Sequence, residues 1–356
     1  MNKQQLIVEL QSTGLKLASA EIGAAGRIGG AGPSDHKAVT VDDTTVMVPI
    51  FNSPAANSPY TVKEQRLQLN GADIGAVSFP PEPKFYSLTT SDGIPYKQIA
   101  LLHSKDVLAT TVLQTCIRYG DNSTSCQFCA IGQSLAAGRT IARKTPEQLA
   151  EVAEAAVRLD GVKHMVMTTG TPNTNDRGAE YLTQCAKAIK ARVNIPIQAQ
   201  CEPPDDFIWF ERLKAAGVDS LGMHLEAVEE QVRAKIMPGK ATVNVDYYFQ
   251  AFAAAVGVFG WGQVSTYLLT GLGDSLKSLV EMSDRLIQIG VYPFVVPFVP
   301  ITGTPLANHP TPSSEWMLTL YQEVGELLQR AGMSAADIKA GCAKCGACSA
   351  IQSFAS

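Results

Sequence analysis

The sequence has little charge, no excess of basic residues and no long apolar run. Only 17% of its 356 residues are charged and the net charge is −4, so nothing favours the basic stripe that nucleic acid or an anionic membrane would bind. No apolar run reaches the roughly 20 residues that cross a bilayer. The first residues, MNKQQLIVELQSTG, lack a secretory apolar core and a cleavage site. These absences predict a cytoplasmic protein with no nucleic-acid and no membrane partner.

Cysteine, by contrast, is concentrated in two places. One group is spaced C-x9-C-x2-C and the other C-x2-C-x2-C, and two further cysteines stand alone. Disulfides rarely persist in the cytoplasm, so clustered thiols indicate metal binding or catalysis. The two groups are Cys116, Cys126 and Cys129, and Cys342, Cys345 and Cys348; the isolated cysteines are Cys185, expected as a small buried hydrophobe, and Cys201.

Residues 1–105 carry the weakest patterns. The glycine-rich stretch IGAAGRIGGAGPSD, residues 22–35, reads as a plain loop rather than a phosphate-binding loop, because no Lys-Ser/Thr pair follows it and no clear strand precedes it. The segment KAVTVDDTTVMVPIF alternates around Asp42 and Asp43, which predicts a hairpin.

From about residue 98, short apolar runs alternate with helical patterns. The clearest helix has Thr145 as N-cap, Pro146 at its first position, Gln148 completing a capping box and Gly161 at its end. Six strands alternate with helices over residues 107–300, which predicts a parallel α/β barrel or a doubly wound sheet. The runs that read as buried strands are VLATTVLQT, KHMVMTTG, IPIQAQC, DSLGMHLE, QVSTYLLTG and YPFVVPFV, preceded by KQIALLH, which is expected to pair before the barrel begins.

The first cysteine group lies in the loop after the first barrel strand, where barrels perform chemistry. Four thiols in two CxxC pairs would indicate structural zinc. Three thiols can instead hold three corners of a cubane iron–sulfur cluster and leave the fourth iron open. A zinc loop or reduced structural thiols remain the alternatives.

Five further motifs follow that loop in order: TTGT, GMHLE, QVRAKIMPGK, YLLTGLGD and the GTPL segment of FVPITGTPLANHP. With a cysteine loop that ends in C-x-aromatic-C, they resemble the radical S-adenosylmethionine (SAM) superfamily over residues 107–308, and biotin synthase and lipoyl synthase in particular. The nine residues between the first two cysteines depart from the usual C-x3-C-x2-C spacing. At full length the chain looks like a radical SAM subfamily encoded beside nitrilases in bacterial gene clusters.

The resemblance implies a role for each motif. The first three cysteines would hold a SAM-binding [4Fe–4S] cluster. The turn after strand two would meet the SAM ammonium, the GMHLE pair the ribose, the arginine the carboxylate, and the aromatic and glycine-rich segments the adenine. The implied SAM-binding residues are Phe128, Thr169, Gly170, Thr171, His224, Glu226, Arg233, Leu268 and Gly271. A structural histidine, a helix N-terminal carboxylate and a surface ion-pair arginine are the alternatives for His224, Glu226 and Arg233.

Two features have no full match in the family pattern. Cys201 and Glu202 end strand three, where we expect them to face the barrel mouth and line the substrate pocket as catalytic candidates; a structural role is the alternative. The C-terminal triad predicts an auxiliary [4Fe–4S] cluster in preference to zinc, because no histidine is near it in sequence. Its fourth site would bind substrate, Cys201 or Ser353, and it would lie over the barrel mouth if the preceding helix folds back.

These observations predict an α/β chain with a partial TIM-like (β/α)6 barrel at residues 106–308, an N-terminal extension with β-hairpins at 1–105 and a C-terminal helix and cysteine-rich cap at 309–356. The implied reaction begins with hydrogen-atom abstraction from a small organic substrate and continues with sulfur insertion, or with oxidation or carbon-skeleton rearrangement. A reducing partner such as flavodoxin or ferredoxin is expected. The competing class is a non-catalytic iron–sulfur or zinc redox sensor, which would not need the GMHLE and YLLTGLGD segments.

Overall fold

The N-terminal part of the chain forms an antiparallel sheet beside a helix. The computed structural model describes residues 2–17, 36–50 and 53–355, so the glycine-rich stretch at 22–35 lies outside the described residues. The strand order is β2-β1-β5-β4-β3. The elements are α1 (Lys3–Thr13), β1 (His36–Val41), β2 (Thr44–Pro49), α3 (Ser53–Ala56), β3 (Tyr60–Lys63), β4 (Arg66–Leu69) and β5 (Ala72–Ser78). The predicted hairpin is confirmed, because β1 and β2 pair around a turn at Asp42 and Asp43.

A short connection leads into the second sheet. It contains η2 (Lys84–Ser87), α4 (Tyr96–Ile99) and β6 (Leu101–His103). β6 pairs antiparallel with the first parallel strand, as expected of the run near residue 98. That run was expected to be extended from Lys97. In fact Pro95 precedes a helical turn, and the strand begins only at Leu101.

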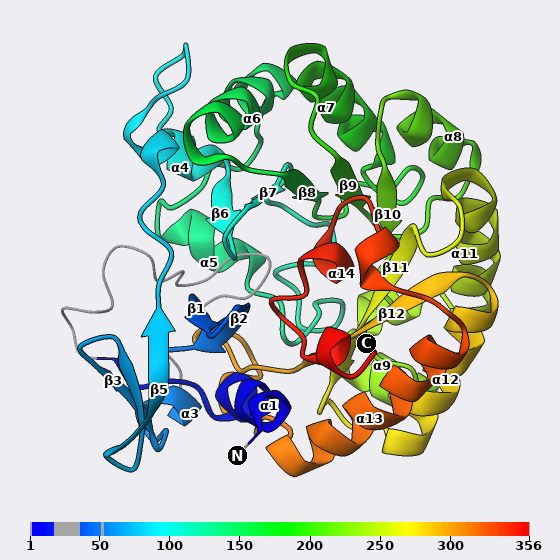
Figure 1. Ribbon diagram of the computed structural model, residues 1–356. Coiled ribbons are helices and arrows are strands. Elements are labelled where there is room, and N and C mark those ends of the chain that lie inside the picture. Colours follow the sequence, from blue (N-terminus) through cyan, green and yellow to red (C-terminus); the bar gives the residue numbers. More distant parts are fainter. Residues whose placement is uncertain (1, 18–35, 51–52, 356) are drawn as a thin grey trace.

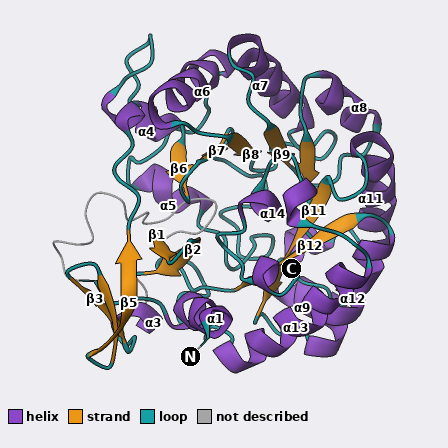
Figure 2. Cartoon of the chain, viewed as in Figure 1, coloured by secondary structure: helices purple, strands orange, loops and turns teal. Residues whose placement is uncertain are grey.

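Parallel strands form a curled sheet with helices on its outside, as Figure 1 and Figure 2 show. Among the described residues this sheet has 7 strands in the order β12-β11-β10-β9-β8-β7-β6, and all neighbours from β7 to β12 are parallel. The predicted partial (β/α)6 barrel is confirmed. Its strands are β7 (Val107–Thr111), β8 (His164–Thr168), β9 (Ile197–Gln200), β10 (Ser220–Gly222), β11 (Val264–Thr270) and β12 (Val291–Pro297).

The helices around the barrel follow their local signals. In α6 the Thr145 hydroxyl accepts from the Gln148 amide at 3.2 Å, and the Gln148 side chain accepts from the Thr145 amide at 2.9 Å. Gly161 ends the helix with φ 64°, and Cys185 is fully buried in α7, both as predicted. The helices are α5 (Ile131–Ala136), α6 (Pro146–Asp160), α7 (Ala179–Arg192), α8 (Ile208–Ala215), α9 (Glu230–Ile236), α10 (Pro238–Ala241), α11 (Val245–Phe259) and α12 (Leu276–Gln288).

The two ends of the chain meet on the open side of the partial barrel. After α13 (Ser314–Arg330) come η3 (Ala335–Asp337), α14 (Cys342–Cys345) and η4 (Ile351–Ser353). Figure 1 shows α14 inside the ring of helices, with α1 close to the C-terminal end. The Gln11 side chain and the Met47 amide both donate to the Ala347 carbonyl, at 3.1 and 2.8 Å.

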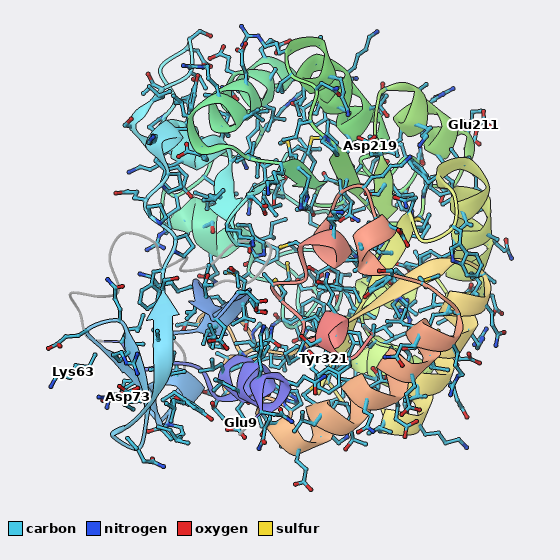
Figure 3. All side chains as sticks on the ribbon, in the orientation of Figure 1. Glu9, Lys63, Asp73, Glu211, Asp219 and Tyr321 are labelled. Atoms are coloured by element: carbon cyan, nitrogen blue, oxygen red, sulfur yellow. The ribbon has the colours of Figure 1, made fainter. Side chains whose placement is uncertain are left out.

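Tyr321 lies where α13 meets this C-terminal segment (Figure 3), and its ring stacks on Phe354 with centroids 5.6 Å apart. Among the described residues, none of the helices combines the length and the apolar character that a membrane crossing requires. The domain boundaries at residues 105 and 308 stay a prediction, although β6 already belongs to the barrel sheet.

Candidate active site

The loop between β7 and α5 carries the first three cysteines, and backbone hydrogen bonds fix it from two sides. On one side, the Ile117 amide donates to the Thr171 carbonyl at 2.9 Å. On the other, the Gln127 amide donates to the Ile236 carbonyl at 2.8 Å. The loop is therefore held against the turn after β8 and against the end of α9.

Two thiols of this loop are buried, so without a bound metal their protonated form is favoured. Burial raises the pKa of Cys129 to about 11 and that of Cys126 well above its ordinary value. The charge of Cys116 further raises the pKa of Cys129, which places these thiols close together. Iron–sulfur clusters are held by thiolates, and the positive irons would favour deprotonation here. Three thiols from one loop match in kind and number the protein ligands of a [4Fe–4S] cluster that keeps one iron open. Among the described residues, no three His, Cys, Asp or Glu side chains are gathered closely enough to hold a single metal ion.

The turn after β8 supports the cysteine loop more than it lines the cavity. The Gly170 amide donates to the Leu113 carbonyl at 2.9 Å, and a Cβ at Gly170 would lie 2.1 Å from the Thr115 carbonyl oxygen. The Thr169 hydroxyl donates to the Gly170 carbonyl at 2.8 Å. Thr168, rather than residues 169–171, faces the cavity described below. Ammonium binding by Thr169, Gly170 and Thr171 stays a prediction.

The GMHLE segment brings His224 and Glu226 to the barrel interior, and both line the cavity. The His224 Nδ1 accepts from the Tyr267 amide at 3.3 Å, and the two rings lie edge to face with centroids 4.4 Å apart. Burial, and then the positive Lys240, lower the pKa of His224 to about 3, so the ring is neutral. A neutral ring that accepts at Nδ1 carries its proton at Nε2.

Glu226 has a partner that the sequence did not single out. Its Oε2 accepts from the Lys240 ammonium at 2.7 Å, and both side chains are largely buried. Burial alone would lower the pKa of Lys240, but Glu226 and other negative groups raise it above its ordinary value. Lys240 lies in the segment QVRAKIMPGK, in which only Arg233 is expected from the sequence to have a role.

That arginine, Arg233, does not line the cavity, and its role beside the SAM carboxylate stays a prediction. The side chain is 2% exposed. Its guanidinium donates to three backbone carbonyls, of Leu225 at 2.8 Å, Ala227 at 3.0 Å and Val243 at 2.9 Å. Arg233 therefore holds the chain after β10 in place. It is a buried structural residue, not a surface ion-pair partner.

The β11 residues are also shifted from expectation. The side chains of Tyr267 and Leu269 line the cavity, whereas Leu268 points into the outer core and is fully buried. Successive side chains of a strand point to opposite faces, which explains the shift by one residue. Gly271 lies beyond the cavity, and its carbonyl is hydrogen-bonded to His309 Nε2 at 2.8 Å. Neither Leu268 nor Gly271 lines the cavity, and their place beside the adenine stays a prediction.

Cys201 and Glu202 do not line the cavity either, and their catalytic role stays a prediction. The inward-facing residue at the end of β9 is Gln200, and Cys201 points into the outer core, where burial raises its pKa to about 12. Glu202 accepts from Arg118 at 2.7 Å and from Arg177 at 3.3 Å. Because Arg118 belongs to the cysteine loop, Glu202 positions that loop.

The C-terminal triad lies at the opposite end of the barrel from the first cysteine loop. The Gly341 amide donates to His164, the first residue of β8, at 3.2 Å. The hydroxyl of Ser220, the first residue of β10, donates to the Ala340 carbonyl at 2.7 Å. The triad thus closes the N-terminal ends of the strands. Our expectation that it would cover the mouth is wrong, because this segment docks under the barrel.

Each thiol of the triad has a polar neighbour from the barrel. The Cys342 Sγ accepts from the Gln200 side-chain amide at 3.3 Å. The Ser104 hydroxyl contacts the Cys345 thiol. The Cys348 Sγ lies 3.4 Å from His103 Nε2. No histidine is near this triad along the sequence, but folding brings His103 to it.

One cavity connects the two cysteine groups. Its volume is about 310 Å³. Phe128 and Cys129 line it at one end and Cys342 and Cys348 at the other. Between them lie mostly apolar walls with a few polar groups, and none of the described residues that line it is Lys or Arg. The polar lining groups are Gln11, His36, His103, Thr110, Thr111, Thr168, Gln200, His224, Glu226 and Tyr267.

Comparison with known proteins assigns the middle part of the chain to a family. Residues 122–286 match the family model described as Radical SAM superfamily. The bacteriochlorophyllide c C-7(1)-hydroxylase of Chlorobaculum limnaeum is 27% identical over 259 residues, which cover 67% of this chain and 63% of that protein. The lipoyl synthase of Halorhodospira halophila is 28% identical over 174 residues, or 47% of this chain and 48% of that one. The matches thus span about half to two thirds of the length of these relatives.

Among solved structures, that of methylornithine synthase has a TM-score of 0.49 and 16% identity, and it covers 72% of this chain and 75% of that one. At that level the likeness says nothing about the reaction. The family model matches the part of the chain that carries most of the motifs. Residues 122–286 thus form a radical SAM superfamily domain.

Proposed function

We propose that this protein reductively cleaves SAM at a [4Fe–4S] cluster held by Cys116, Cys126 and Cys129, and that it abstracts a hydrogen atom from a small organic substrate. The observation that carries the proposal is the single cavity that runs from the cysteine loop past His224 and Glu226 into the barrel. A redox sensor would not need such a cavity beside its metal centre.

The cluster, when bound, would supply the electron that splits the SAM sulfonium and so starts radical chemistry. The protein's own contribution is to hold, orient and shield. Glu226, paired with the Lys240 ammonium, presents its carboxyl group to the ribose hydroxyls. His224 offers an Nε2 donor beside it. Phe128 packs with the apolar group that includes Leu272 and Phe298, which keeps water from the cysteine loop.

The substrate is of low charge and largely apolar. The cavity walls include Ala109, Val166, Leu269 and Val296, and the described lining residues provide no cation that would bind a free carboxylate or phosphate. A buried charge without a partner is costly. Side-chain amides and imidazoles, such as those of Gln200 and His103, would instead orient hydroxyl or carbonyl groups.

A second [4Fe–4S] cluster held by Cys342, Cys345 and Cys348 is part of the proposal. Support comes from the position of Cys342 and Cys348 on the cavity wall, opposite the first cysteine loop. A cluster there would meet the substrate from the far side, where it could donate sulfur or accept an electron. Sulfur insertion and oxidation are therefore the two outcomes that the geometry favours, and carbon-skeleton rearrangement is the third.

The proposal includes a reducing environment and a reducing partner. Six thiols that serve clusters must stay reduced, as they do in the cytoplasm. A flavodoxin or ferredoxin would supply the electron, and neither nucleic acid nor membrane is needed as a partner. The likeness to a subfamily encoded beside nitrilases stays a prediction.

The test is anaerobic reconstitution with iron and sulfide, followed by dithionite and SAM, with 5′-deoxyadenosine as the readout. The wild-type chain should form it, and the chain with Cys116, Cys126 and Cys129 changed to Ala should not. Cys201→Ala is the matched control and should retain SAM cleavage, because Cys201 lies off the cavity. Product formation at the wild-type rate by the triple variant would refute the cluster assignment.

A further inference from the structure

The hairpin between β6 and β7 supplies a histidine to the C-terminal triad. We propose that His103 is the fourth protein ligand of the metal centre that Cys342, Cys345 and Cys348 form. This rests on the second centre of the proposed function. It completes that centre as a set of three cysteine ligands and one histidine ligand. These ligands come from two segments more than 230 residues apart in sequence, and the pair in contact, Cys348 and His103, is separated by 245 positions.

The hairpin is placed for this role by its own pairing. His103 pairs with Val107 across the β6–β7 turn, so the imidazole stands beside the first residue of the first parallel strand. Its Nε2 lies 3.4 Å from the Cys348 Sγ. The next residue, Ser104, has a left-handed φ of 57° and contacts the Cys345 thiol. Two adjacent residues of one turn thus touch two different thiols of the triad.

The candidates suggested by sequence lie elsewhere. Cys201 points into the outer core, and the charged groups that act on it are Glu202, Asp176 and Arg177 rather than a triad thiol. Ser353 ends a short 3-10 turn, where its carbonyl accepts from the side chain of Gln4.

Two other side chains lie near the triad and have different tasks. His164 accepts the Gly341 amide at its Nδ1, so it is a positioning residue for the backbone before Cys342. Ser104 would have to ionise to ligate iron as an alkoxide. His103 is therefore the ligand candidate that both reaches a thiol and lines the cavity.

The charge of the surroundings favours a neutral ligand. Three thiolates already bring three negative charges to a cavity whose described lining residues include no Lys or Arg. Lys344 lies between two of the cysteines in sequence, but its ammonium is directed to the Ala336 carbonyl at 2.9 Å. A fourth thiolate or an alkoxide would add uncompensated charge, whereas an imidazole adds none. A centre with four protein ligands also leaves no iron open for a substrate atom.

The experiment uses the full chain with Cys116, Cys126 and Cys129 changed to Ala, so that only the C-terminal centre loads with iron and sulfide. After dithionite reduction, pulsed electron paramagnetic resonance should show a strongly coupled nitrogen. His103→Cys should abolish that coupling while about four irons per chain are retained. His164→Gln and Ser104→Ala are the controls, and both should keep the nitrogen signal.

The results distinguish an incorrect fourth ligand from an incorrect type of metal centre. Nitrogen coupling that persists in His103→Cys, or that vanishes in His164→Gln alone, overturns the assignment of His103. Uptake of zinc in place of iron refutes the second iron–sulfur cluster. The ligand is then judged by zinc affinity, which must fall in His103→Ala and stay unchanged in His164→Gln. If this variant binds neither iron nor zinc, both the second centre and the role of His103 as its ligand are overturned.

Discussion

Among single residues, Glu226 combines the most unusual features of the site. Its φ of 67° is left-handed, a conformation that costs a non-glycine residue on the order of 1–3 kcal/mol and persists only where neighbours fix it. The fixing contacts are two backbone hydrogen bonds of 2.8 Å to β11, from the Glu226 amide to the Tyr267 carbonyl and from the Leu269 amide to the Glu226 carbonyl. The strained backbone of Glu226 is therefore held in place at a position whose side chain lines the cavity.

Glu226→Ala should weaken SAM binding. Removing a buried, charged hydrogen bond costs roughly 1.5–3 kcal/mol, which is about 10- to 150-fold in affinity. The measurement is anaerobic titration calorimetry on the reconstituted protein. Glu229→Gln is the matched control, because that carboxylate accepts from Ser275 and Ser278 and does not line the cavity. An unchanged dissociation constant in Glu226→Ala would reject the ribose role.

His224 should make stability depend on pH in the acid range. Its pKa is lowered to about 3 in the folded chain, below the ordinary 6.5. Between these values the unfolded chain binds a proton that the folded chain does not, so stability falls as the pH falls from about 6.5 toward 3, by up to about 1.4 kcal/mol per pH unit.

In His224→Gln this part of the slope should disappear. Urea unfolding of the apo-protein at several pH values measures it. Equal slopes for the two chains would show that the ring is not held neutral.

A substitution of Arg233 distinguishes a structural role of this residue from a SAM-binding role. Arg233→Met leaves three carbonyls without their donor and should lower the free energy of unfolding by at least about 3 kcal/mol. The SAM affinity of the folded fraction should stay within a few-fold of wild type. Urea unfolding and SAM titration decide it. A large loss of affinity at unchanged stability would restore the carboxylate-binding role.

At the scale of elements, local sequence signals correctly predicted local structure such as helix ends and a hairpin. The capping box and final glycine set both ends of α6, and the alternation around Asp42 and Asp43 set the β1–β2 hairpin. Motif matching placed residues to within one position but did not resolve the face of a strand. A shift of one residue reverses a side chain. Gln200 therefore occupies the place expected of Cys201, and Tyr267 and Leu269 flank the expected Leu268.

Contacts between distant segments could not be predicted in this way. The docking of the C-terminal segment under the barrel depends on pairs such as Ser220 with Ala340 and His164 with Gly341, which are 120 and 177 positions apart. No periodicity or cap encodes which end of a barrel a segment closes. For the same reason, the sequence did not predict Lys240 as the partner of Glu226 or His103 as the neighbour of Cys348.

Gly170 tests how the turn after β8 supports the cysteine loop. A Cβ there would lie 2.1 Å from the Thr115 carbonyl oxygen, so Gly170→Ala should displace the loop and reduce iron at the first centre. Iron content and visible absorbance after reconstitution of the C-terminal triple-Ala variant measure it. Gly257→Ala in α11 is the control, since no atom lies within 4 Å of its added Cβ. Full iron loading in Gly170→Ala would contradict this role.

At the scale of the whole molecule, both ends of the chain contribute to the wall of one cavity. Gln11 of α1, His36 of β1 and Met47 of β2 line the cavity together with Cys342 and Cys348. The N-terminal part therefore does more than extend the barrel, because it closes the side that the curled sheet leaves open. We therefore propose two iron–sulfur centres that face one substrate space from opposite ends.

Iron and sulfide quantification after anaerobic reconstitution tests that proposal most directly. The wild-type chain should hold about eight irons, and each triple-Ala variant, of Cys116, Cys126 and Cys129 or of Cys342, Cys345 and Cys348, should keep about four. Only the variant of the C-terminal triad should still cleave SAM. A wild-type chain that saturates near four irons, with no loss when the C-terminal triad is removed, would contradict the two-centre account.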